Sequence, residues 1–198
     1  MKHILIAIFI ILFFPVVAFA NVGVPMIFLS YPTMIIALLP VIFLETSIFK
    51  KIVPTPYKKA LISNGTANGI STIAGFPLAW GFLFAIELIT TGGSCGPGFS
   101  TLPKSIITVI VEAAWICPRD NQLYWLVPTA FIISLIVAFF VSLIIEYFIN
   151  KRFHKEQDKG SIKKAVYLAN ISSYALLVAL SVGYLVFSIF LEVQQKNF

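Results

Sequence analysis

Two sets of polar residues interrupt otherwise apolar stretches of this chain, and their types are the ones that could do chemistry. Each set contains a Glu, then an Asn, then a Ser three residues after the Asn. Carboxyl, amide and hydroxyl groups held away from water need hydrogen-bond partners, so these side chains could tie helices together. The same groups could instead form a polar site for a small solute or an ion. The six residues are Glu45, Asn68, Ser71, Glu146, Asn170 and Ser173.

The two sets follow one order at nearly one spacing. The offsets between them are 103 residues for Val24 and Val127, 101 for the two Glu residues, and 102 for the two Asn residues. A Lys pair follows each Glu, with an offset of 105 residues between Lys58 and Lys163. This recurrence predicts two related helical hairpins, although Lys pairs after membrane spans are common enough to recur by chance.

The composition indicates a membrane protein. Of 198 residues, 59% are apolar and only 11% are charged, which lies outside the range of soluble domains. Apolar runs of about 20 residues are long enough to cross a hydrocarbon core of about 30 Å. A net charge of +6 is then explained by membrane topology and does not indicate nucleic acid.

Four spans can be placed, at about 25–45, 66–90, 124–148 and 165–191, with a long loop at 91–123. We therefore expect an all-α integral membrane protein, a four-helix transmembrane bundle in a single domain over 21–198. On this reading each Glu ends its span, where its carboxylate could reach water or nearby Lys residues.

The charges of the loops predict the orientation. The connection at 46–64 carries four Lys residues and no acid, and the connection at 149–164 carries six basic residues against two acidic ones. Basic loops stay in the cytoplasm during insertion, so both ends of the mature chain should lie outside. The two hairpins then run in the same direction, as parallel repeats do. We expect a bacterial inner membrane.

The N-terminal residues 1–20 have the pattern of a secretory signal peptide. Lys2 provides a basic start, residues 4–14 are apolar, and Ala18 and Ala20 stand before a cleavage site at Asn21. An uncleaved extra span is the alternative. Both readings leave Asn21 outside.

The loop at 91–123 contains both cysteines, Cys95 and Cys117. An oxidising compartment favours a disulfide between them. Thiol oxidation of a partner is the alternative, but the chain lacks the C-x-x-C pair of such enzymes. An apolar stretch at 105–116 is too short to cross the bilayer, so we expect an interfacial outer helix there.

Other chemistry has no sequence signal. His3 and His154 lack partners at metal-ligand spacing, and no phosphate-binding loop, dinucleotide fingerprint or nucleophile elbow occurs. We therefore expect no metal and no cofactor, and thiol oxidation stays the one enzymatic alternative. Small residues every four positions, among them Ser63, Ala67 and Gly75, favour a helix contact over a substrate path.

The stretch 67–80 (ANGISTIAGFPLAW), with 40–45 (PVIFLE) before it, resembles a group of uncharacterised bacterial inner-membrane proteins. The resemblance implies a bacterial multi-span protein and assigns no activity to any residue.

Three functions fit these features. A structural or accessory membrane protein, or an assembly subunit, is the leading expectation. A small-solute or ion transporter using the Glu and Asn residues is the first alternative, and a thiol redox protein acting on the periplasmic side is the second. The expected partners are the lipid bilayer and either other membrane subunits or a second copy, with no nucleic acid.

Overall fold

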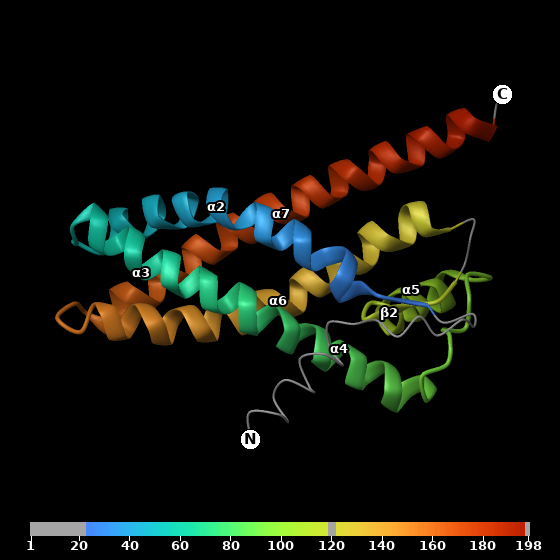
Figure 1. Cartoon of the computed structure of the whole chain (residues 1–198), viewed down its shortest axis with the longest axis horizontal. Coiled ribbons are helices and arrows are strands. Elements are labelled where there is room, and N and C mark those ends of the chain that lie inside the picture. Colours follow the sequence, from blue (N-terminus) through green and yellow to red (C-terminus); the bar gives the residue numbers. More distant parts are fainter. Residues whose placement is uncertain (1–22, 119–121, 197–198) are drawn as a thin grey trace, which may run out of the picture.

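Four apolar stretches fold into helices long enough to cross a membrane, as the sequence predicts. The computed structural model describes residues 23–118 and 122–196, so the expected signal peptide at 1–20 lies outside the described residues. The elements, shown in Figure 1, are β1 (Val24–Pro25), α2 (Met26–Ile52), α3 (Tyr57–Ile70), η1 (Ser71–Gly75), α4 (Phe76–Thr91), α5 (Leu102–Val111), β2 (Trp115–Ile116), α6 (Leu123–Phe153) and α7 (Lys159–Lys196). The elements α3, η1 and α4 form one continuous helix over Tyr57–Thr91.

The helices extend further into the Lys-rich connections than the sequence analysis placed them. Most of 46–64 and of 149–164 is helical, which leaves only 53–56 and 154–158 as turns. Lys is a good helix former and is favoured in the last turn by the helix dipole, so these residues prolong the helices. Helix α2 ends just before Pro54, because proline disfavours helical geometry in the residue that precedes it.

The helices pack in a ring. Helix α2 contacts α3 and α7, and α6 contacts the same two helices. A central apolar cluster that includes Met34, Phe76 and Leu135 fills the middle of the bundle. Beyond Ser181, α7 diverges from the other helices (Figure 1), and its large side chains there are exposed, Tyr184 by 59% and Phe187 by 56%.

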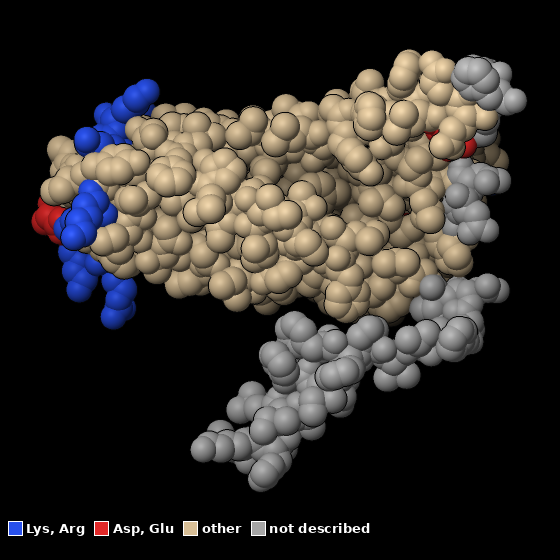
Figure 2. All heavy atoms as spheres, turned by 45° about the horizontal axis from the view of Figure 1, so that its top comes forward, with Lys and Arg blue, Asp and Glu red and all other residues tan. Residues whose placement is uncertain are grey.

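Charge separates the two ends of the bundle. In the view of Figure 2 the Lys and Arg side chains gather at one end, next to a long belt without charge. We call the end formed by 50–59 and 151–164 the Lys-rich end. The opposite end, formed by 92–118, contains the disulfide between Cys95 and Cys117 and is called the disulfide end.

The expected helix at 105–116 is only partly correct. Helix α5 ends at Val111, and Trp115–Ile116 instead forms strand β2, which pairs antiparallel with β1. Glu112 ends the helix, because its carboxylate accepts the backbone N–H of Gly96 at 2.9 Å and so ties the chain to the preceding loop. The ladder also requires Gly23, since a Cβ there would lie 1.8 Å from the carbonyl oxygen of Ile116.

Helix α5 buries Thr108, Val109 and Val111 and exposes several Ile side chains. Thr108 is fully buried and exchanges two hydrogen bonds of 2.9 Å with the backbone of Gly98. Ile106 and Ile107 on the other side are half exposed. An apolar exposed face favours contact with lipid, as expected for an interfacial helix.

Replacing both Cys95 and Cys117 by Ser should lower the free energy of unfolding. The disulfide closes a loop of 22 residues, for which the chain-entropy model gives a loss of about 3 kcal/mol. Denaturation of the purified protein in detergent would measure the change, with Ser100→Ala in the same loop as the control. Coincident unfolding curves for the double variant and the unmodified protein would contradict this expectation.

Candidate functional site

Glu45 on α2 lies inside the bundle, only 1% exposed. Its Oε2 accepts a hydrogen bond from Nδ2 of Asn68 at 2.6 Å, and its Oε1 accepts one from Oγ of Ser173 at 2.5 Å. Asn68 belongs to the next helix, α3, whereas Ser173 belongs to α7, at the other end of the chain. The carboxyl group therefore joins three helices.

Glu146 on α6 has the corresponding environment and is 2% exposed. Its Oε2 accepts a hydrogen bond from Nδ2 of Asn170 at 2.7 Å, and its Oε1 accepts one from Oγ of Ser71 at 2.9 Å. Each Glu thus binds the Asn of the helix that follows it and the Ser of the other hairpin. We call these six side chains the carboxyl–amide network. It is built of the six residues singled out in the sequence and includes all four long helices.

The two carboxyl groups belong to one network and are near enough for the charge of Glu45 to act on Glu146. Among the described residues, only Asn and Ser side chains donate hydrogen bonds to the two carboxyl groups. The one ion pair found in the described ranges joins Lys59 to Glu156 and involves neither carboxyl group. No basic side chain in the described ranges therefore compensates this buried acidic pair. Such a pair in a membrane is costly and marks a functional site by default.

The depth of the pair differs from the sequence expectation. Glu45 and Glu146 each stand seven residues before the last residue of their helices, which at 1.5 Å per residue is about 10 Å inside the helix end. The expectation that each Glu closes its span and reaches water or Lys is therefore wrong. It failed because α2 and α6 continue beyond the apolar runs on which the spans were placed.

A π-helical segment lies against Glu146. The segment η1 begins at Ser71, and its widened turn is closed by the N–H of Phe76 bonding the Ser71 carbonyl oxygen. The cause is Pro77, whose ring would clash with the carbonyl of Ile73 in a regular helix. π-helical turns inside α-helices are frequent at functional sites.

A small cavity adjoins the network. Its volume is about 20 Å³, and its lining includes Asn68, Ser71, Glu146 and Tyr174 among apolar residues of α2 and α7. This volume is enough for about one water molecule. The network thus has room for an entity the size of water and not for an organic solute.

Sequence analysis missed a polar stripe that runs from the network toward the Lys-rich end. Ser142, Glu146 and Asn150 on α6 and His154 directly after its end follow one another at steps of four, and all are at least 95% buried. Asn150 donates from Nδ2 to the carbonyl oxygen of Glu146 at 3.1 Å, and Nδ2 lies 3.5 Å from Oδ1 of Asn64 on α3. The spacing of four residues could have revealed this stripe from the sequence. It was overlooked because Asn150 and His154 lie beyond the expected span at 124–148.

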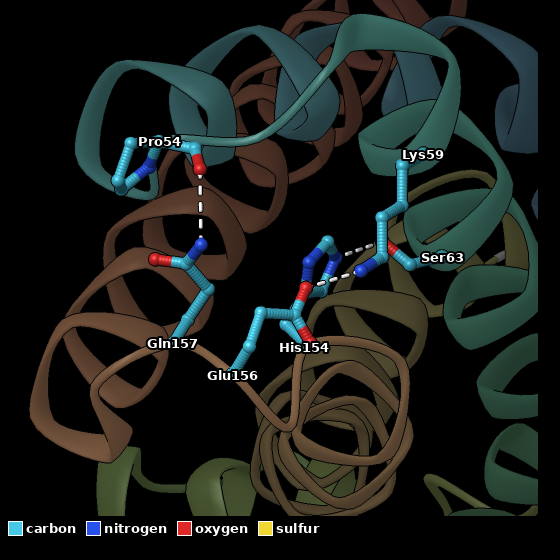
Figure 3. A network of polar contacts seen from close by, with 6 residues as sticks. All are labelled: Pro54, Lys59, Ser63, His154, Glu156 and Gln157. Atoms are coloured by element: carbon cyan, nitrogen blue, oxygen red, sulfur yellow. Dashed lines mark hydrogen bonds and ion pairs between the residues drawn. The ribbon is translucent and has the colours of Figure 1, made fainter.

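His154 ends the stripe beneath the surface of the Lys-rich end (Figure 3). Its Nε2 lies 2.9 Å from Oγ of Ser63, and its ring contacts Phe49 with centroids 5.1 Å apart. The ion pair of Lys59 and Glu156 lies next to it. Burial, and secondarily the charge of Lys59, lowers the pKa of His154 below its ordinary value of 6.5, so the imidazole is neutral near pH 7.

The disulfide end has a different chemistry. Cys95, Glu112 and Cys117 are the one group of potential metal ligands found within the described ranges, but their two sulfur atoms are joined to each other. Thiolates are the metal ligands that cysteine offers, so the oxidised pair supplies none.

No family model, no curated protein and no solved structure matches this chain. The resemblance of 67–80 to uncharacterised inner-membrane proteins therefore stays a prediction. The functional argument rests on the geometry described above.

Removing either serine hydroxyl of the network should weaken the packing of the hairpins. Ser71→Ala and Ser173→Ala each delete a bond between hairpins, which costs roughly 0.6–2 kcal/mol in a membrane protein. Ser172→Ala is a matched control, because its exposed hydroxyl bonds only the carbonyl of Leu168 in its own helix. Unfolding in mixed detergent micelles would measure the difference. Equal stability of all three variants would contradict a role for these bonds.

Proposed function

We propose that the protein is an inner-membrane ion carrier that binds a proton at the Glu45–Glu146 pair. The observation that carries this proposal is the burial of two carboxyl groups in one hydrogen-bond network, with no basic side chain bonded to either among the described residues. Two ionised carboxylates at one site repel each other, and sharing a proton relieves that repulsion. The cavity of about 20 Å³ supports a proton or a hydrated proton over an organic solute.

The serines support reversible binding. Oγ of Ser71 lies 2.9 Å from Glu146 and 3.1 Å from the carbonyl oxygen of Asn68, so its single proton has two acceptors. Ser173 has the same choice between Glu45 and the carbonyl of Asn170, at 2.5 and 3.1 Å. An ionised Glu accepts the hydroxyl proton, whereas a protonated Glu donates to Ser, which then donates to the backbone. Both protonation states keep their hydrogen bonds in one geometry.

The proposal includes a duplicated architecture of two parallel hairpins, α2–α3 and α6–α7. Its support is that each contact of Glu45 has a counterpart at Glu146, with offsets of 101 or 102 residues. Related hairpins packed about an axis along the membrane normal would place the two carboxyl groups together near that axis.

The proposed orientation puts the Lys-rich end in the cytoplasm and the disulfide end outside. The support is the gathering of Lys and Arg at one end (Figure 2), because basic loops are retained in the cytoplasm. A disulfide also persists on the oxidising side of a bacterial inner membrane. On this proposal the membrane-embedded chain ends outside.

Assembly with another membrane subunit is the second candidate. The observation in its favour is the part of α7 beyond Ser181, which diverges from the bundle and exposes Tyr184, Phe187 and Phe190 by more than half. A partner helix or a second copy would cover this face. The carboxyl–amide network would then serve to fix the helices that present α7.

Proton flux into liposomes tests the ion-carrier proposal. The protein would be reconstituted with a pH-sensitive dye inside, and a membrane potential would be imposed with potassium and valinomycin. We expect uptake above protein-free liposomes, and its loss in Glu45→Gln and Glu146→Gln, which keep the side-chain shape but bind no proton. Ser47→Ala, an exposed change on α2 near Glu45, should keep the flux. Wild-type flux in both Gln variants would refute the proposal.

Labelling in spheroplasts tests the orientation. After mild reduction, Cys95 and Cys117 should react with a membrane-impermeant maleimide added from outside. In a variant lacking both cysteines, Gln157→Cys at the Lys-rich end should react only after the membrane is broken. The reverse pattern would overturn the topology.

A further inference from the structure

We propose that protons reach the carboxyl pair from the Lys-rich end along the buried polar stripe of α6, with His154 as the residue that relays them. This inference rests on the proposed proton-binding function and adds the route and the relay group. Asn150 stands between His154 and Glu146 at steps of four on one helix face, so the three residues form a continuous line.

Unpartnered polar atoms mark this line. Within the described ranges, Oδ1 of Asn150, Nδ1 of His154 and Oδ1 of Asn170 are buried without a hydrogen-bond partner. Buried polar atoms almost always have partners, and single buried waters commonly supply them where protein groups do not. Asn150 and His154 follow Glu146 toward the Lys-rich end, and Asn170 bonds Glu146 itself. Their unpartnered atoms are therefore free acceptors along or beside this line.

The hydrogen bonds of His154 fit a relay. Ser63 Oγ lies 3.1 Å from the carbonyl oxygen of Ala60 and 2.9 Å from Nε2 of His154. When its proton goes to Ala60, it accepts a hydrogen bond from Nε2–H. The neutral ring then carries its proton on Nε2 and leaves Nδ1 as a bare acceptor. A proton that binds Nδ1 makes the ring doubly protonated. Release of that proton from the same atom returns the ring to its neutral form, and the Nε2 proton stays on its bond to Ser63 throughout.

The surrounding groups define where the route opens. The charged residues that face His154 are Lys59 on α3 and Glu156 in the turn after α6, and they pair with each other over the ring (Figure 3). Gln157 closes the same turn by donating to the carbonyl oxygen of Pro54 at 3.1 Å. On its inner side the ring meets Ser63 and Phe49. The entrance is thus the partly exposed ion pair at the surface.

The equivalent route toward Glu45 is apolar. The residues 101 positions before Asn150 and His154 are Phe49 and Val53, and both are fully buried in an apolar cluster with Ile162 and Val166. Glu45 therefore lacks, along its own helix, the polar line that Glu146 has toward the Lys-rich end. Protons would enter through Glu146 and reach Glu45 by way of the shared pair.

Time-resolved infrared spectroscopy after a pH jump tests the route in the reconstituted full chain. The carboxylic-acid signal that disappears in Glu146→Gln reports proton binding at the pair. His154→Val inserts the residue found at position 53, and His154→Gln keeps polarity without titrating. We expect both to slow protonation by at least about tenfold, as loss of a positioned proton-transfer group does, while the equilibrium midpoint stays that of the unmodified protein. Val53→Ala is the matched control and should keep the rate.

The outcomes separate the two proposals. A wild-type rate in His154→Gln, with the carboxyl signal intact, would overturn the route and leave the proton site standing. An altered midpoint with an unchanged rate would also overturn the route, because it would give His154 a structural role. Absence of any titrating carboxyl signal in the unmodified protein would refute proton binding itself, and the route with it.

Discussion

The structure depends on the burial of two carboxyl groups in one hydrogen-bond network between four apolar helices. Such groups are tolerated away from water only when hydrogen bonds and a compensating charge or proton stabilise them. Here the hydrogen bonds come from Asn68, Asn170 and two serines, one pair for each carboxyl group. The donors arrive from both hairpins, so the same bonds that accommodate the acids also fix how the hairpins pack.

This constraint explains several local features that would otherwise be unrelated. Pro77 widens the helix at Ser71, the residue that bonds Glu146. The packing of both α2 and α6 against α3 and α7 lets each carboxyl group meet donors from two helices. At the other end of the bundle the cap formed by α5, the two-residue ladder and the disulfide uses its own polar contacts, and it leaves the centre of the bundle unaffected.

The sequence indicated the six polar residues because their order recurs at offsets of 101 and 102 residues. It could not show that each Glu bonds the Ser of the opposite hairpin, because spacing along one helix does not say which helices become neighbours. His154 was missed because α6 runs past the apolar stretch, and Trp115–Ile116 was expected to be helical because Glu112 and the disulfide act through contacts distant in sequence. Local sequence patterns predict where the helices lie, whereas the residues at which they end depend on contacts between residues distant in sequence.

The most direct test of the shared proton is the carbon-13 chemical shift of the Glu45 and Glu146 carboxyl groups in lipid, assigned with the two Gln variants. Protonated and ionised carboxyl groups have distinct shifts. We predict that near neutral pH the pair holds a proton, and that both signals change together when this proton leaves, as expected for coupled groups. Two carboxyl signals that both stay in the ionised position and titrate independently would contradict it.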